Sequence, residues 1–314
     1  MTATAADAAP PRGAFWPAFA ALVGGAVAMG ISPILVRLAD VGPFASAFFR
    51  VLLALPVLYA WMRLEEARSP GAPDRLPRFS GPIIATALFF TADLFFWHLA
   101  ILNTTVANAT FFGTTAPVWV VIFSWLVYRR RVSVAALAGL GLCLVGGLAL
   151  IGQSFALAPE RLIGDGLAAL TAVFFGGFFL AVEKARAHHR AAHVTFYMSI
   201  ITTILLGVVA IGAHFFLGQR LLPADPRGWL ILIALAWISH AGGQGLLSVA
   251  LGSLPAMFSS LVIFLEALAA AGLGWLVLSE RVTLLQAVGG IVIVAGIWIA
   301  RPRERKPDIS ETAL

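Results

Sequence analysis

Residues 247–296 read LSVALGSLPAMFSSLVIFLEALAAAGLGWLVLSERVTLLQAVGGIVIVAG, and this stretch is a second copy of residues 97–146 at a constant offset of 150. The identities are a Trp-Leu-Val at 125–127 and 275–277, an Arg-Val at 131–132 and 281–282, and two glycine pairs, Gly139 with Gly289 and Gly146 with Gly296. In both copies an apolar segment, a short charged turn and a glycine-rich segment follow one another. Such a repeat indicates two related structural units in one chain.

The composition indicates a membrane protein. Of the 314 residues, 60% are hydrophobic and only 11% are charged, and many apolar runs reach about 20 residues. The formal charge of +6 does not point to nucleic acid, because the basic residues lie in short segments between apolar runs and near the C-terminus. Cys143 is the one cysteine, so an intrachain disulfide is excluded. We therefore expect the lipid bilayer, and not nucleic acid, to surround or contact this chain.

Ten apolar segments are long enough to cross a bilayer as helices. They cover approximately residues 16–38, 44–62, 81–101, 104–128, 133–151, 165–183, 194–216, 229–250, 255–278 and 283–300. We expect five helices in each half, with the halves at 16–151 and 165–300. The short segment 1–15 is expected to be a disordered cytoplasmic N-terminus, and 301–314 a charged cytoplasmic tail.

The distribution of Lys and Arg predicts the orientation. With the N-terminus inside, the cytoplasmic segments carry fifteen of these residues and the opposite segments carry four. Both termini are therefore expected in the cytoplasm, in a multi-pass protein of the cell inner membrane. Because each half has an odd number of helices, the second half must have the opposite orientation to the first. Inverted repeats of this kind are typical of secondary transporters.

The sequence also resembles a known family, the drug/metabolite transporter superfamily, and specifically its EamA-type branch. The motifs that carry the resemblance are Pro117-Val118, Trp125-Leu126-Val127, Glu280-Arg281-Val282-Thr283 and the glycine-rich last segment. The resemblance extends from about residue 16 to 301 and implies a ten-helix fold that transports small metabolites. It implies no particular substrate, since members move amino acids, riboflavin, sugars and polyamines. The chain departs from the family at 129–131, where a Glu often precedes the Arg, and at Glu266-Ala267, where Pro117 would repeat.

Charged residues at membrane depth are costly and are therefore candidate functional residues. Arg50 and Asp93 lie roughly 9 and 12 Å below the outer ends of the second and third helices, at 1.5 Å per residue. At these depths the two side chains could meet. They would form either a buried ion pair that joins two helices or a proton or cation site at Asp93 balanced by Arg50.

Glu266 and His240 are expected at similar depths, roughly 16 to 18 Å from the outer surface. Near the midplane, inverted-repeat transporters place their substrate site at the interface between the halves. Our hypothesis makes Glu266 the coupling residue that binds and releases a proton, with His240 or Gln244 as its hydrogen-bond partner. In the alternative, the hydroxyls of Ser259 or Ser260 satisfy Glu266 and its role is structural.

The fourth segment carries a polar stripe that ends at Pro117, which removes one helical hydrogen bond. Asn108 and Thr114 are its candidate cavity residues, and Asn108 is the stronger of the two; the alternative is helix packing. Trp97, one turn from Asp93, is the candidate for an aromatic cavity wall. The glycine-rich runs, including Gly139, Gly141 and Gly146, are expected to allow close helix packing.

The remaining motifs restrict the function. The sequence contains no Gly-x-x-x-x-Gly-Lys loop for ATP and no Gly-x-Ser-x-Gly motif, so neither an ATP-driven pump nor an enzyme is expected. The His188, His189 and His193 cluster lacks a full ligand set, so neither a metal nor another cofactor is expected. We expect a proton-coupled exporter or exchanger of small polar or amphipathic metabolites. The alternatives are an importer of vitamins or organic cations and a non-transporting receptor or scaffold, and a homodimer remains compatible with the sequence.

Overall fold

The computed structural model describes residues 13–68, 76–151, 159–278 and 283–302, and within these ranges the side chains of 106–107 and 274–278 are not described. Every regular element in the described ranges is helical. In that part of the chain nine helical segments are long and apolar enough to cross a membrane, and Leu284–Ile299 is a shorter apolar helix. The predicted terminal segments lie almost entirely outside the described residues, and the charged turn at 279–282 lies wholly outside them.

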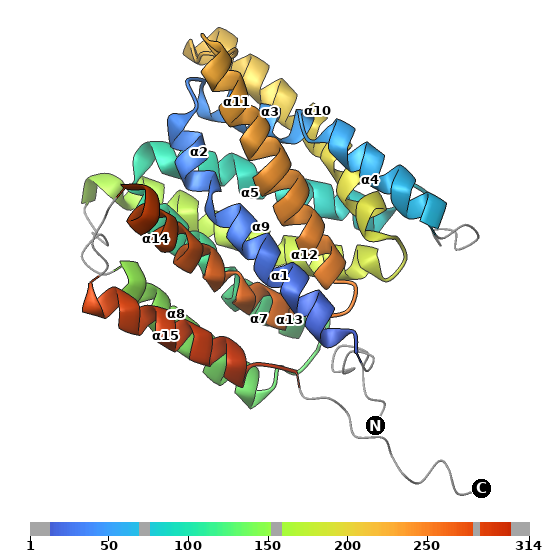
Figure 1. Ribbon diagram of the computed structural model, residues 1–314, viewed down its shortest axis with the longest axis vertical. Helices are drawn as coiled ribbons and strands as arrows, with labels where there is room; N and C mark the ends of the chain where they lie inside the picture. Colours follow the sequence, from blue (N-terminus) through green and yellow to red (C-terminus); the bar gives the residue numbers. More distant parts are fainter. Residues whose placement is uncertain (1–12, 69–75, 152–158, 279–282, 303–314) are drawn as a thin grey trace, which may run out of the picture.

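The first half contains five membrane-spanning segments (Figure 1). The first segment consists of α1 (Phe15–Gly30) and α2 (Ser32–Leu38), and the second of α3 (Pro43–Leu52) and α4 (Leu55–Arg68). The third is the continuous helix α5 (Gly81–Asn103). The fourth consists of α6 (Val106–Thr114) and α7 (Ala116–Leu126), and the fifth is α8 (Val134–Ile151).

The second half repeats this order. A short 3-10 turn, η3 (Pro159–Arg161), leads into α9 (Leu162–Arg186), and α10 (Ala191–Leu217) follows. The third segment of this half consists of α11 (Pro226–Ala234), the π-helical segment η4 (Leu235–Gln244) and α12 (Gly245–Ala250). The fourth consists of α13 (Ala256–Val262) and α14 (Phe264–Leu278), and the last is α15 (Leu284–Ile299).

Five of the ten spans are interrupted, which corrects the description of each span as one segment. Pro33, Pro56 and Pro117 lie at the start of α2, α4 and α7, where a missing backbone N–H costs least. The break between α13 and α14 contains no proline, and the span from α11 to α12 changes to π-helical hydrogen bonding instead. Irregular backbone at membrane depth is tolerated where it is buried in protein or lines a cavity.

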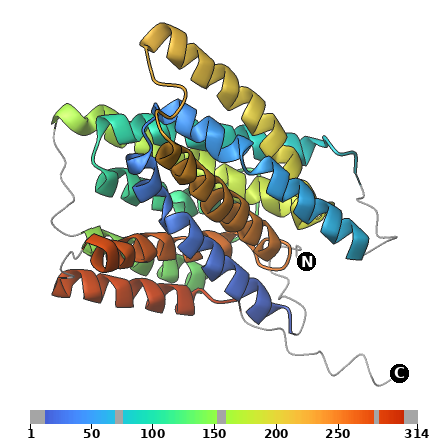
Figure 2. The ribbon, with the colours of Figure 1, turned by 45° about the horizontal axis from the view of Figure 1, so that its top comes forward.

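Helices α8 and α15, the last of each half, lie side by side (Figures 1 and 2). A Cβ atom at Gly146 would come 2.6 Å from the Gly289 carbonyl oxygen, and one at Gly296 would come 2.7 Å from the Gly139 oxygen. Gly139 therefore contacts Gly296, the repeat partner of Gly146, and Gly146 contacts Gly289, the repeat partner of Gly139. This crossed pairing requires that the two helices run antiparallel. This contact confirms the inverted relation of the two halves. The prediction that Gly141 also packs closely against another helix is wrong, because a Cβ atom there would meet nothing within 4 Å.

Other contacts follow the same pseudosymmetry. The third span of the first half, α5, packs on α9, the first span of the second half. The equivalent pairing, α1 against η4 and α12, is also present. The N-terminal end of α1 and the C-terminal end of α15 lie at the same edge of the molecule (Figure 1), as an even number of crossings requires. The predicted class, ten membrane helices in two inverted repeats, is therefore confirmed.

Candidate functional site

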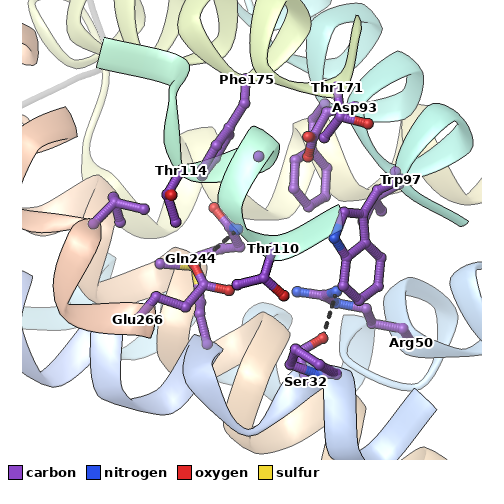
Figure 3. A pocket seen from close by; sticks show the side chains of 16 residues that line it. Ser32, Arg50, Asp93, Trp97, Thr110, Thr114, Thr171, Phe175, Gln244 and Glu266 are labelled. Atoms are coloured by element: carbon purple, nitrogen blue, oxygen red, sulfur yellow. Dashed lines mark hydrogen bonds between the residues drawn. The ribbon is translucent and has the colours of Figure 1, made fainter. Parts of the chain in front are cut away.

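The interrupted spans and the continuous helices α5 and α9 surround a central cavity of about 60 Å³. Its lining comes from both halves (Figure 3) and includes six of the eight predicted site residues. The lining residues are Met29, Ser32, Pro33, Arg50, Phe90, Asp93, Leu94, Trp97, Thr110, Gly113, Thr114, Thr171, Phe175, Gln244, Ile263 and Glu266.

Several lining residues lie directly at the helix breaks. Ser32 and Pro33 begin α2, Thr114 is the last residue of α6, and Ile263 separates α13 from α14. Gln244 is the last residue of the π-helical segment η4. Because broken helices leave backbone groups without helical partners, breaks that face one cavity are a feature of transporter binding sites.

Arg50 joins the two halves at one side of the cavity. Its side chain is buried, and its guanidinium donates hydrogen bonds to the Ser32 and Ser239 hydroxyls, both at 3.1 Å. Ser32 belongs to α2 and Ser239 to η4. Among the described residues Arg50 makes no direct ion pair with Asp93, so the ion-pair alternative is not formed in this structure. The guanidinium donates to the two serine hydroxyls instead.

Both carboxylates nevertheless line the same cavity as this arginine. In Figure 3 the Glu266 carboxyl group points toward Arg50 from the opposite side of the view, and the Thr110 hydroxyl is drawn between them. The cavity therefore holds one cation and two carboxyl groups, without a direct salt bridge between them in this conformation.

The expected hydrogen bonds to Glu266 are not formed. His240 lies outside the lining, where its Nε2 atom is hydrogen-bonded to the Ser199 hydroxyl at 2.9 Å. Gln244 does line the cavity, but its amide nitrogen donates to the Met29 sulfur at 3.2 Å. The Gln244 amide oxygen has no hydrogen-bond partner within the described part of the chain. That oxygen is therefore a buried acceptor without a partner, on a residue that lines the cavity.

The two serines named as alternative partners, Ser259 and Ser260, do not bind Glu266 either. The Ser260 hydroxyl donates to the Met257 carbonyl oxygen at 2.9 Å. The Ser259 hydroxyl is fully buried and has no hydrogen-bond partner among the described residues. Neither serine therefore satisfies Glu266 in this structure.

An aromatic wall completes the cavity. Trp97, Phe90 and Phe175 line it beside the charged groups, which suits a molecule with both an apolar and a charged part. A volume of about 60 Å³ accommodates only a few water molecules, well below the several hundred Å³ of a typical ligand pocket. The cavity as it stands is therefore too small for a metabolite.

Asn108 lies away from the cavity lining. Its amide nitrogen donates to the Asp165 carboxylate at 2.9 Å, and the Thr104 hydroxyl donates to the same oxygen at 2.6 Å. Asp165 is buried in the first turn of α9, so it fastens that turn to the junction between α5 and α6. Sequence reasoning missed Asp165, although an acidic residue near the start of an apolar segment was a usable signal.

Comparison with known proteins agrees with this architecture. The model of the EamA-like transporter family matches the chain twice, over residues 16–152 and 162–301. The chain belongs to the EamA-like transporter family. A protein of Archaeoglobus fulgidus named an uncharacterized transporter is 29% identical over 287 residues, which is 90% of this chain and 95% of that protein. The pseudopaline exporter CntI of Pseudomonas aeruginosa is 27% identical over 259 residues, 82% of this chain and 86% of the exporter.

A solved crystal structure supports the same fold. It superposes with a TM-score of 0.75 and 18% sequence identity, and the alignment covers 92% of this chain and 96% of the other. Membership in the family makes this EamA-like protein a multi-pass membrane transporter with a small-molecule substrate.

Asn108→Ala is expected to destabilise this transporter by about 1–3 kcal/mol, because it removes a donor to the buried Asp165 carboxylate. The KM for substrate should change less than twofold, since Asn108 does not line the cavity. Thermal unfolding in detergent and uptake into proteoliposomes measure the two effects. Asn103→Ala is the matched control, since that exposed amide donates to the Leu99 carbonyl oxygen within its own helix. Unchanged stability together with a large rise in KM would instead make Asn108 a transport residue.

Proposed function

We propose that this transporter exports small polar or amphipathic metabolites of amino-acid-like chemistry, in exchange for protons. The observation that carries the proposal is the central cavity, in which Arg50 shares one space with Asp93 and Glu266. An amino-acid-like molecule carries a carboxylate that suits the guanidinium and an ammonium group that suits a carboxylate. The Gln244 amide oxygen offers a further acceptor for that ammonium group.

Proton exchange is supported by the balance of charge. A buried site with one cation and two ionised carboxylates carries an excess negative charge, which is costly away from water. Either a proton or the cationic group of the substrate removes that excess. If both compete for Glu266, with Asp93 as the second carboxylate, their binding is mutually exclusive and transport becomes exchange. The name of one relative, a pseudopaline exporter, supports the outward direction.

The two halves, 16–151 and 165–300, are proposed to open the cavity alternately to the two sides of the membrane. Arg50 and Ser32 belong to the first half and Ser239 to the second, so the hydrogen bonds of Arg50 must change when the halves move apart. The larger number of Lys and Arg residues on one side supports cytoplasmic termini in an inner membrane.

An organic cation is the second candidate substrate. Two carboxyl groups outnumber the single arginine in the lining, and Trp97 supplies the aromatic face to which cations are attracted. This candidate differs from the first in one requirement, because a molecule without a carboxylate makes no use of Arg50.

Uptake into proteoliposomes tests the proposal. The panel consists of radiolabelled zwitterionic amino acids, vitamins and organic cations, each measured with and without an imposed proton gradient. We expect zwitterionic compounds to accumulate only with the gradient, and a protonophore to abolish that accumulation. Uptake confined to organic cations would support the second candidate. Uptake of zwitterions that is the same with and without the gradient would contradict proton exchange.

A further inference from the structure

A second cavity, of about 540 Å³, lies at one end of the helical bundle. It is bounded by the end of α7, the start of α8, the end of α9, the start of α13 and the end of α15. None of its lining residues lines the central cavity. By the distribution of Lys and Arg this end is the predicted cytoplasmic face. The volume is within the range of sites that bind small organic molecules.

Positive charge dominates the polar part of this second cavity. Arg130, Arg131 and Arg301 line it, against the single carboxylate of Glu183. The Glu183 carboxylate already has two partners within the chain, because it accepts hydrogen bonds from Arg130 at 3.0 Å and from the Ala256 backbone N–H at 3.1 Å. Within the described part of the chain neither Arg131 nor Arg301 pairs with a carboxylate. Neither guanidinium group is therefore neutralised by a carboxylate of the described residues.

The other part of the cavity is apolar. Val132, Ala136, Leu180 and Phe258 line it next to the arginines. An anion that is wholly polar, such as free phosphate, would leave these side chains without a partner. The lining therefore fits a molecule with an anionic head and an apolar continuation.

The position of the cavity matches the level of lipid headgroups. Trp125 on α7 and Trp298 on α15 are 60% and 61% exposed at this end of their helices. Exposed tryptophans of membrane proteins are concentrated at the membrane–water interface. The Arg301 guanidinium also lies over the Trp298 ring, 4.4 Å from its centre. The arginines are thus at the depth where phosphate groups of the bilayer are found.

We propose that this cavity is a binding site for an anionic phospholipid, with Arg131 and Arg301 on the oxygens of its phosphodiester. Guanidinium groups bind phosphate through paired hydrogen bonds, and basic pockets between membrane helices on the cytoplasmic side favour anionic headgroups. The beginning of the acyl chains lies along the apolar wall at Leu180 and Phe258. Because Arg131 precedes α8 and Arg301 follows α15, the bound lipid joins the two halves.

Thermal unfolding of the purified full-length chain in detergent, titrated with phosphatidylglycerol, tests this site. A ligand that binds only the folded state raises the melting temperature with its concentration. We expect phosphatidylglycerol to raise it, and phosphatidylcholine or inorganic phosphate at equal concentration to have little effect. Native mass spectrometry of the same samples should show phosphatidylglycerol retained on the protein. The double variant Arg131→Gln/Arg301→Gln should lower the apparent affinity for phosphatidylglycerol on the order of tenfold or more.

The matched control is the double variant Arg63→Gln/Arg78→Gln. It removes two exposed charges from the same predicted face, and neither residue lines the cavity. We expect it to bind phosphatidylglycerol like the unmodified protein. An equal loss in both double variants would show only general attraction to a basic surface and would overturn the proposal. Undiminished binding by Arg131→Gln/Arg301→Gln, or equal stabilisation by inorganic phosphate, would overturn it too.

Discussion

Glu266→Gln is expected to abolish transport driven by a proton gradient, with the initial rate falling on the order of a hundredfold. The side chain lies at the start of α14 and lines the same cavity as Arg50. Glutamine keeps the size of the side chain but carries no exchangeable carboxyl proton, and it removes one of the two carboxyl groups that share the cavity with Arg50. Initial rates in proteoliposomes, with and without the gradient, measure the effect.

Counterflow between equal pH on both sides separates coupling from substrate binding. If Glu266 carries the proton, Glu266→Gln should retain measurable substrate exchange while gradient-driven accumulation is lost. Glu160→Gln is the control, because Glu160 is exposed in η3 and does not line the cavity. Full proton dependence in Glu266→Gln would refute the coupling role and would direct attention to Asp93→Asn.

Gly146→Ala is expected to destabilise the packing of α8 against α15. The added Cβ would lie 2.6 Å from the Gly289 carbonyl oxygen and 2.9 Å from the Ile293 backbone nitrogen. Backbone atoms cannot move aside as a flexible side chain does, so α15 must shift away from α8. Overpacking of this kind costs roughly 1–3 kcal/mol. Thermal unfolding in detergent should therefore show a melting temperature lower by several degrees.

Gly141→Ala, in the same helix, is the matched control. A Cβ atom there meets nothing within 4 Å, and alanine favours the helix by up to about 1 kcal/mol over glycine. We expect this variant to be as stable as the unmodified protein or slightly more so. If the two variants unfold at the same temperature, the close glycine contact between α8 and α15 does not determine stability.

Much of the fold could be predicted from the sequence because its signals are local or repeated. Apolar segments about 20 residues long are expected in a membrane whatever packs around them, and the offset of 150 residues relates the halves before any contact is known. The cost of charge at membrane depth likewise marked Arg50, Asp93 and Glu266 as candidates. All three line one cavity, while their roles in transport stay predictions.

The partners of those residues depended on information that sequence does not contain. A side chain in a helix points according to the rotation and tilt of that helix, and an uncertainty of one residue turns it by about 100°. Estimated depth in the membrane therefore suggested contacts of Arg50 with Asp93 and of Glu266 with His240. In the folded chain Arg50 donates hydrogen bonds to Ser32 and Ser239 instead. The helix break at Ile263 could not be predicted from the sequence either, because no proline lies at that position.

The sequence by itself thus determined the membrane environment, the ten spans and the two repeats, since hydropathy and repetition act along the chain. Only the tertiary structure decided that Gly139 meets Gly296 and that Asn108 binds Asp165 instead of facing the cavity. The physical reason is that these contacts join segments far apart in the chain. Their geometry follows from how closely whole helices pack.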